Sequence, residues 1–219
     1  MPRSPFPPVL VAVLAGLLAL PAAAVDDPPF DFAGDRYASG AEPDLGDAPR
    51  RSVFAAGETV RSPAPASGSV HLAGRHVEQS GPVAGSVYAA GQVVRVSGDV
   101  GGDASLAGQD VSTAAPVQGV IRAMAQRIDI DAPAGAVLLM GETVRLNAEI
   151  AGDAYILAER FETGPDARIL GRLTLGAEDA PPLGTLARGG VEIIETTEPM
   201  FGGGIGMFGL VLGAIRSLL

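Results

Sequence analysis

The sequence predicts an all-β fold, a single-stranded parallel β-helix of about seven to eight rungs with about 17 residues each. Two series of small residues recur in step along the chain, and apolar and polar residues alternate between them. The first series contains only glycine: Gly68, Gly85, Gly102, Gly119, Gly135, Gly152 and Gly171. The second series is Gly57, Gly74, Gly91, Gly108, Ala125, Gly141 and Ala158. A shared period indicates a solenoid, in which each unit buries its apolar side against the next.

Residues 1–24 are expected to be a secretory signal peptide. Arg3 precedes an apolar run over residues 9–20, and residues 22–24 are three alanines that form a small-residue cleavage site. The run is about twelve residues long, whereas a span of the bilayer needs roughly twenty. An uncleaved N-terminal anchor is the alternative. We therefore expect an exported protein, either periplasmic or associated with a membrane of the cell envelope.

Residues 25–51 are expected to form a flexible leader. The segment is rich in aspartate, glutamate and proline and has little apolar periodicity. Such a composition buries too little apolar surface to offset the entropy of ordering the chain.

Residues 52–177 carry the repeat and are expected to form the β-helix domain. Residues 86–102 show the pattern of one unit, in which apolar residues alternate with outward ones on both sides of Gly91. Alternation with a period of two indicates strands. The inward residues of this unit are Val87, Ala89, Val94, Val96 and Val100.

Superposition of the units gives five inward columns, one for each of these positions. The first two columns begin at Val53 and Ala55 and end at Leu173 and Leu175. An outward column lies one residue past the third inward column and consists of Arg61, Glu78, Arg95, Ser112, Asp129, Arg145 and Glu162. In four places, neighbouring rungs of this column carry opposite charges. Such a solvated ladder supports the register of the fold and does not indicate a ligand.

The two small-residue series predict different backbone constraints. The all-glycine series is expected to mark corners with positive φ, where a Cβ would clash. The second series includes Ala125 and Ala158, so close packing at a bend is the expected constraint there.

The C-terminal part departs from the repeat. Residues 178–199 are expected to be a linker or to add one last strand through Val191, Ile193 and Ile194. Residues 200–219 are rich in glycine and apolar, yet too short to cross a bilayer. They could bind a membrane surface or a partner groove, or cap the end of the rod.

Composition excludes several classes of function. The chain has 15 Lys and Arg residues, all of them arginine, against 25 acidic residues and a net charge of −10, which disfavours nucleic acid as a partner. It has no cysteine, so thiolate catalysis, disulfides and cysteine metal sites are excluded. We expect no catalytic residue, no metal site and no cofactor, because no phosphate loop or nucleophile motif is present.

The titratable residues have structural interpretations. His71 lies in an outward column with Phe54 and Tyr88, which predicts stacking across rungs rather than metal binding. Asp103 and Asp153 each follow a glycine, as in calcium-binding β-roll repeats. The nonapeptide pattern of those repeats is missing, so turn capping is the preferred role.

Two classes of β-helix enzyme are alternatives to a structural protein. Polysaccharide lyases and hydrolases place carboxylates in a cleft framed by long loops, whereas every unit here is 16 to 19 residues long. Hexapeptide acyltransferases repeat an inward residue every six positions, which does not match the spacing of the inward columns.

Residues 52–177 resemble the bactofilin group of polymer-forming cytoskeletal proteins. The resemblance rests on the rung pattern V/I-x-G-D/S-V/A-x-x-A-G in units such as SGPVAGSVYAAGQVVRVSGDVGG and IAGDAYILAERFETGPDARILGRLTLGA. It implies a right-handed, roughly triangular β-helix that polymerises head to tail without nucleotide and has no catalytic residues. The predicted signal peptide departs from typical bactofilins, so an exported envelope scaffold is expected.

A β-helix needs a cap or a partner at each end, because each end presents unpaired backbone groups and an apolar layer. Self-association is therefore expected through the rung of Val53 and Ala55 at one end and that of Leu173 and Leu175 at the other. The alternative is a monomeric envelope module that binds glycan, or a membrane-protein partner, through the outward column of Phe54, His71 and Tyr88.

Overall fold

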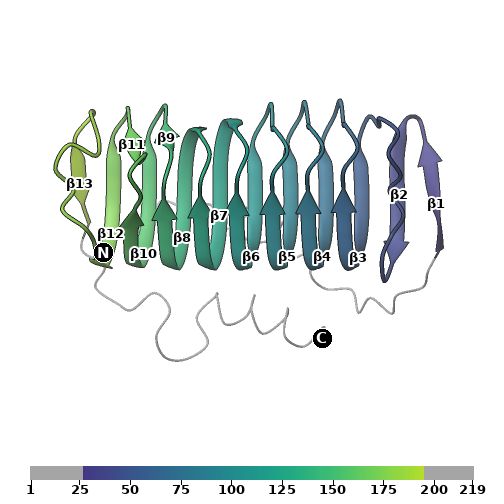
Figure 1. The fold of residues 1–219 in the computed structure, drawn as a ribbon, viewed down its shortest axis with the longest axis horizontal. Helices are drawn as coiled ribbons and strands as arrows, with labels where there is room; N and C mark the ends of the chain where they lie inside the picture. Colours follow the sequence, from purple (N-terminus) through teal and green to yellow (C-terminus); the bar gives the residue numbers. More distant parts are fainter. Residues whose placement is uncertain (1–26, 195–219) are drawn as a thin grey trace, which may run out of the picture.

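The structure is a computed structural model that describes residues 27–194 and shows an all-β solenoid of about nine turns (Figure 1). Successive turns lie side by side along one axis, from β1 (Asp27–Phe32) at one end to β13 (Val191–Ile193) at the other. The predicted fold class is confirmed, with more turns than the expected seven to eight. No helix long and apolar enough to cross a membrane occurs between residues 27 and 194.

Each turn adds one strand to a continuous ladder. These strands are β2 (Asp35–Gly40), β3 (Val53–Ser62), β4 (Val70–Gln79), β5 (Val87–Val96), β6 (Ala104–Thr113), β7 (Val117–Ile130), β8 (Ala134–Leu146), β10 (Ala154–Thr163) and β12 (Leu173–Asp179). All of them pair in parallel, and equivalent residues of successive units are partners, as Val70 is of Val87 and Gly74 of Gly91. The register predicted from the repeat is therefore confirmed.

Each full-length strand bends near its middle. In β3 the inward positions change from Val53 and Ala55 to Val60 and Ser62, so the alternation reverses between the two halves. The ladder also skips Glu58, which follows Gly57. Each long strand therefore contributes two faces of the rod rather than one.

A second ladder runs along the third side of the rod. It consists of single bridges and short strands, including β9 (Glu149–Ile150) and β11 (Arg168–Ile169). Its members are Arg50, Ala66, Val83, Val100, Val117, Ala134, Ile150, Ile169 and Ala187. From Val83 to Ile169 this ladder is the fifth inward column, and those residues are buried.

The interior is a stack of aliphatic layers. Every residue of the first, second, third and fifth inward columns is buried, with Phe161 as the largest buried side chain. The fourth column also holds polar residues, and Ser62, Gln79 and Thr113 are buried there. Burial of branched aliphatic side chains in register is the main stabilising term of such a stack.

The N-terminal segment differs from the expected flexible leader. Residues 27–40 form β1 and β2, and β2 pairs in parallel with β3 while β1 folds back antiparallel on β2. Asp35 accepts hydrogen bonds from Arg51 at 2.7 Å and from the backbone N–H of Ser52 at 3.0 Å, which tie this turn to the next. The solenoid therefore begins before residue 52. The expected signal peptide, residues 1–24, lies outside the described residues.

The C-terminal end contains β13, the last strand that was one of the two expectations for residues 178–199. β13 pairs in parallel with β12, so the solenoid also continues beyond residue 177. The apolar segment at residues 200–219, with its expected membrane or capping role, lies outside the described residues.

None of the seven first-series glycines has a positive φ. Among residues 27–194 the glycines with positive φ are Gly34, Gly40, Gly46, Gly184 and Gly190, so the expectation of left-handed corners is wrong. The close approach of adjacent turns explains the glycines instead. A Cβ on Gly85 would lie 2.5 Å from the carbonyl oxygen of Gly68, and one on Gly152 would lie 2.7 Å from that of Gly135.

The second small-residue series is also closely packed. A Cβ on Gly108 would lie 2.6 Å from the carbonyl oxygen of Gly91. Ala125 and Ala158 occupy equivalent positions and are buried. The expectation of close packing at the bend is confirmed.

Candidate interaction surfaces

Val53 and Ala55 do not lie at an end of the rod. Strand β2 covers them, because Arg36 pairs with Val53 and Ala38 with Ala55. Both residues are buried. The prediction that they form a polymer interface is wrong, since one more turn precedes them.

Leu173 and Leu175 are covered in the same way at the other end. Val191 pairs with Leu173 and Ile193 with Leu175, and both leucines are buried. The predicted interface at these residues is therefore wrong as well. The exposed apolar side chains at this end are Val191 and Ile193, which are 38% and 69% exposed.

Strand β1 closes the N-terminal end of the described rod. It includes Pro28 and Pro29, which have no N–H group to donate to a further strand. Phe30 and Phe32 of the same strand are 59% and 64% exposed. This end is therefore poor in backbone donors and rich in exposed aromatic surface.

The predicted outward aromatic column is present at Phe54, His71 and Tyr88. These residues lie on β3, β4 and β5 and are cross-strand partners. The ring centroids of Phe54 and His71 are 4.6 Å apart and those of His71 and Tyr88 are 4.7 Å apart, with planes within 7° of parallel. The rings therefore stack face to face along the axis of the rod.

The column continues into the segment that was expected to be flexible. The ring of Tyr37 on β2 stacks on Phe54 at 4.9 Å, and Phe30 lies 6.1 Å from Tyr37. A sequence signal for this turn exists, because Tyr37 and Gly40 each lie 17 residues before Phe54 and Gly57. The segment has few apolar residues, so this spacing is not accompanied by the apolar alternation that marks the other turns.

Stacking leaves mainly ring edges exposed. Both faces of Phe54 and of His71 are covered by neighbouring rings, whereas Tyr88 has only Ser105 as its next partner in the column. Burial among the rings lowers the pKa of His71 below its ordinary value of 6.5. The column therefore presents a neutral aromatic surface at neutral pH, with one open ring face at Tyr88.

The aromatic column is one half of a larger surface, which we call the apolar face. The apolar face consists of two outward columns on the first halves of β3 to β10 and on β2. The first column is Tyr37, Phe54, His71, Tyr88, Ser105, Arg122, Leu138 and Tyr155. The second column is Ser39, Ala56, Ala73, Ala90, Ala107, Met124, Met140 and Leu157.

Arg122 is the only charged residue of the apolar face. Its Nη1 donates to Oδ2 of Asp103 at 2.8 Å, so the charge is compensated within the same copy. The rest of the face offers aromatic, aliphatic and thioether groups, together with the hydroxyls of Ser39 and Ser105. On this face Tyr37 and Tyr88 are 38% and 42% exposed, whereas Ala107 is buried.

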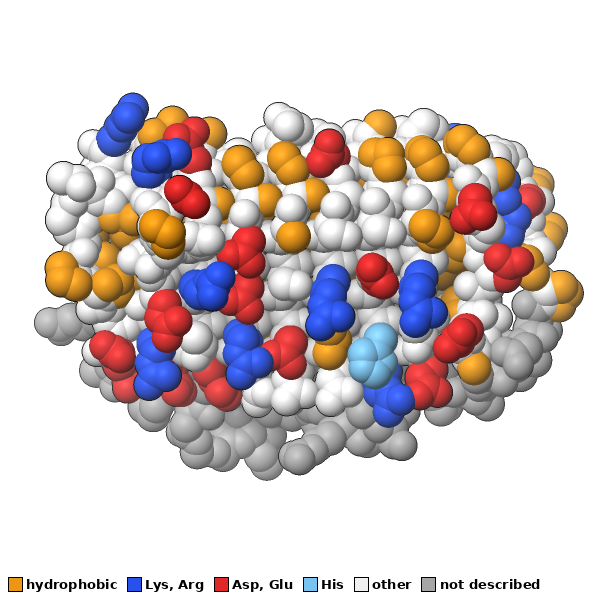
Figure 2. Space-filling view, viewed as in Figure 1, with side chains coloured by type: hydrophobic (Ala, Val, Ile, Leu, Met, Phe, Trp, Pro, Cys, Tyr) orange, Lys and Arg blue, Asp and Glu red, His pale blue; other side chains and the backbone are white. Residues whose placement is uncertain are grey.

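The outward side chains on the second halves of the strands are largely charged or polar, and we call this surface the charged face. Its outward columns are Thr59, His76, Val93, Asp110, Arg127, Thr143 and Arg160, and Arg61, Glu78, Arg95, Ser112, Asp129, Arg145 and Glu162. Figure 2 shows rows of red and blue side chains along the rod.

Ion pairs cross the turns of the charged face. Arg61 lies 3.9 Å from Glu78 and Arg145 lies 3.7 Å from Asp129, which confirms two of the four expected contacts between neighbouring rungs. Arg127 also pairs with Asp110. Exposed pairs of this kind contribute about 0.2–1 kcal/mol each and keep the face hydrated.

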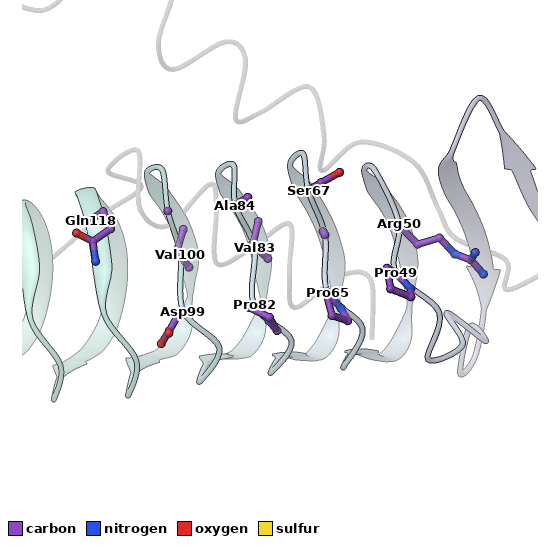
Figure 3. A pocket seen from close by; sticks show the side chains of 12 residues that line it. Pro49, Arg50, Pro65, Ser67, Pro82, Val83, Ala84, Asp99, Val100 and Gln118 are labelled. Carbon is purple, nitrogen blue, oxygen red and sulfur yellow. The ribbon is translucent and has the colours of Figure 1, made fainter.

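A shallow groove of about 650 Å³ follows one corner of the rod over the first turns (Figure 3). Pro49, Pro65, Pro82 and Asp99 lie in a row on successive turns and form its lower wall. Asp99 is the only carboxylate in its lining. General acid–base catalysis with two carboxylates is therefore not available in this groove.

Asp103 and Asp153 act as backbone acceptors between turns. Oδ1 of Asp103 accepts the N–H of Val120 at 2.9 Å, and Oδ1 of Asp153 accepts the N–H of Arg172 at 2.8 Å. Ser86 plays the same role one turn before Asp103, because its Oγ accepts the N–H of that aspartate at 3.1 Å. Both carboxylates therefore tie one turn to the next, a role that differs from the expected capping of their own turns.

Between residues 27 and 194 no group of three or more His, Cys, Asp or Glu side chains lies close enough together to hold a metal ion. Comparison with protein-family models found no match, and comparisons with curated proteins and with solved structures found none.

Proposed function

We propose that this chain is a non-enzymatic structural scaffold of the bacterial cell envelope, similar to the bactofilins, that assembles end to end without nucleotide. The observation that carries the proposal is an unbroken solenoid with exposed apolar side chains at both described ends. Phe30 and Phe32 lie at one end, and Val191 and Ile193 at the other. The even length of the units supports a structural role, because it leaves no long loops to frame a substrate.

The two ends are expected to meet through side chains more than through backbone pairing. Among residues 27–194, β13 has an unpaired edge of only three residues, and the edge of β1 contains Pro28 and Pro29. Contact between aromatic rings and aliphatic side chains buries apolar area without requiring a continuous hydrogen-bond ladder. The residues to test as an interface are therefore Phe30, Phe32 and Ile193. They take the place of the four residues predicted from the sequence, Val53, Ala55, Leu173 and Leu175.

Sedimentation velocity and electron microscopy of the full-length chain test the proposal. We expect filaments or concentration-dependent oligomers, and we expect Ile193→Asp or Phe32→Asp to abolish them, because each places a charge at the contact. Thr143→Asp adds the same charge to the side of the rod, between Arg127 and Arg160, and should leave assembly unchanged. Assembly that is absent in the parent chain or insensitive to both end variants would overturn the proposal.

The open ring face of Tyr88 supports a second candidate, a glycan-binding envelope module. A sugar ring packs against an exposed aromatic face, and Tyr88 is 42% exposed next to the small Ser105. Glycan pulldown with the parent chain and Tyr88→Ala distinguishes the two functions. Loss of glycan binding in Tyr88→Ala, with no filaments in the parent, would favour the binding module.

A further inference from the structure

The ring stack of the first outward column ends at Tyr88, because its next partner, Ser105, carries no ring. Successive centroids from Tyr37 to Tyr88 lie 4.9, 4.6 and 4.7 Å apart, so the rise of one turn sets the spacing. A further ring at this spacing would lie on the open face of Tyr88, above Ser105. The Ser105 side chain is small, and Tyr88 is 42% exposed, so the ring face is accessible to a ligand.

Arg122 follows Ser105 in the same column, one turn farther from Tyr88. Its Nη1 donates to Oδ2 of Asp103 at 2.8 Å, which directs the guanidinium back toward the turn of Ser105. Asp103 precedes Ser105 by two residues, about 6.6 Å along the chain. A ring above Ser105 would therefore have Tyr88 on one side and the pair of Arg122 and Asp103 on the other.

The pair of Arg122 and Asp103 retains hydrogen-bonding capacity. A guanidinium has several N–H donors, and among residues 27–194 Arg122 uses one of them, on Asp103. Each carboxylate oxygen of Asp103 accepts one bond, from Val120 or from Arg122, and each has a second acceptor site. The two side chains are 42% and 39% exposed. The pair thus offers donors and acceptors side by side without a net charge.

We propose that Tyr88, Ser105, Arg122 and Asp103 form a site for one uncharged pyranose ring of a glycan, which we call the sugar site. The inference rests on the glycan-binding candidate above and specifies its ligand class, a neutral sugar. The axial C–H groups of one sugar face pack on the Tyr88 ring. Adjacent hydroxyls of the sugar donate to Asp103 and accept from Arg122 and Ser105.

The geometry favours a sugar over a flat aromatic ligand. Tyr88 and Arg122 are two turns apart, about 9.6 Å, whereas carbon atoms in contact lie about 3.5–4.0 Å from each other. A puckered pyranose is thicker than an aromatic ring and fills this distance more completely. It also carries donors and acceptors on neighbouring carbon atoms, which match Asp103 and Arg122.

Charge favours an uncharged sugar. The backbone N–H of Val120 and the guanidinium of Arg122 lower the pKa of Asp103 below 3.8, so the carboxylate is ionised at neutral pH and compensates the arginine. A carboxylate on the sugar would lie close to Asp103 and be repelled. The net charge of −10 on the chain also repels an acidic glycan at longer range.

NMR titration of the full-length chain tests the sugar site with two tetrasaccharides of the same linkage. The neutral probe is β-1,4-linked glucose, and the acidic probe is β-1,4-linked glucuronate. The chain has three tyrosines, so the ring resonances of Tyr88 can be assigned by substitution. We expect a dissociation constant of about a millimolar for the neutral probe, because one exposed ring face gives little binding energy. The acidic probe should bind at least about threefold more weakly.

Two tyrosine substitutions test the position of the ligand. Ser105→Tyr extends the stack with a ring of the protein itself and should abolish binding, so the loss does not reflect unfolding. Ser112→Tyr adds the same ring to the charged face, between Arg95 and Asp129, and should leave binding unchanged.

Two further substitutions test the recognition of hydroxyls and charge. Arg122→Lys retains the charge but lacks the planar fork, and should weaken binding of the neutral probe about three- to tenfold. Asp103→Asn leaves Arg122 uncompensated and should reverse the preference toward the acidic probe. A merely structural role of Asp103 would weaken binding of both probes alike.

Three outcomes would overturn the inference. Unchanged binding of the neutral probe in Ser105→Tyr would place the sugar elsewhere and leave the glycan-binding candidate standing. Equal or tighter binding of the acidic probe by the parent chain would contradict the choice of an uncharged sugar. Absence of binding of both probes to the parent chain would contradict the sugar site and the glycan-binding candidate together, while end-to-end assembly is judged separately by sedimentation.

Discussion

The imidazole of His71 lies face to face with the ring of Phe54, with ring centroids 4.6 Å apart and planes 6° from parallel. Burial in this stack lowers the pKa of His71 below 6.5, so the folded state favours the neutral imidazole. The unfolded chain binds a proton near pH 6.5, whereas the folded chain binds it only at lower pH. Stability conferred by the neutral ring is therefore present above about pH 6.5 and lost as the pH falls below it.

Replacement of this histidine should remove that acid sensitivity. We expect the urea midpoint of the parent chain to fall between about pH 7.5 and about pH 5, and to fall less in His71→Phe, which retains the stack without a titrating group. His76 is present in both proteins and is exposed. Equal pH dependence of the two proteins, or a pKa of His71 above 6.5 by NMR titration, would contradict this prediction.

Gly85 should not tolerate a methyl group although its φ is not positive. A Cβ at this position would lie 2.5 Å from the carbonyl oxygen of Gly68 and would push adjacent turns apart. We expect Gly85→Ala to lower the free energy of unfolding by about 1–3 kcal/mol in urea titrations. Ser80→Ala, at an exposed position of a connection, should change it by less than about 0.5 kcal/mol. An unchanged free energy of unfolding in Gly85→Ala would contradict close contact between the turns of Gly68 and Gly85.

Asp103 should contribute more to stability than an exposed ion-paired aspartate. Its carboxylate accepts the N–H of Val120 and pairs with Arg122, and these contacts, the backbone bond first, lower its pKa below 3.8. We expect Asp103→Asn to cost about 1 kcal/mol near pH 7, since the site is partly exposed. Asp110→Asn, which loses only the exposed pair with Arg127, should cost less than about 0.5 kcal/mol.

The effect of Asp103→Asn should also depend on pH. Because the pKa is lowered on folding, the contribution of the carboxylate is present above about pH 3.8 and lost as the pH falls through the folded pKa. Unfolding measurements at about pH 7 and about pH 3 should therefore show a smaller difference between parent and variant in acid. A constant difference would assign the effect to packing rather than to charge.

Removal of a buried hydroxyl should stabilise the rod. Thr113 is buried, and its Oγ1 has no hydrogen-bond partner among the described residues. Thr113→Val has nearly the same shape, so we expect a gain of about 1 kcal/mol in the free energy of unfolding. Thr143→Val, at an outward position, serves as the control. Destabilisation by Thr113→Val would indicate that the hydroxyl is hydrogen-bonded in the folded protein.

Much of the fold follows from the repeat in the sequence. The columns that begin at Val53 and Val60 are buried as predicted, and the stack of Phe54, His71 and Tyr88 follows from their spacing of 17 residues. Such features are local to one unit and its neighbour. A period read from the chain is therefore sufficient to predict them.

The turn formed by β2 shares the 17-residue spacing through Tyr37 and Gly40, but it lacks the apolar columns on which the predicted bounds of the β-helix rested. It has few apolar residues, and its contacts with the next turn are the pairing with β3 and the ion pair between Asp35 and Arg51. A preformed neighbouring strand supplies the hydrogen-bond partners that this segment cannot supply alone. The predicted ends at Val53 and Leu173 were consequently one turn too far inward.

The sequence by itself determined the solenoid, its register, the inward columns and the aromatic stack, because side-chain alternation and the period of the repeat are properties of the chain. Only the tertiary structure decided where the stack ends, why the first-series glycines are needed, and how the apolar and charged residues divide between two faces. Those features depend on the contact of each turn with the next and on the bend after Gly57, which reverses the alternation within one strand.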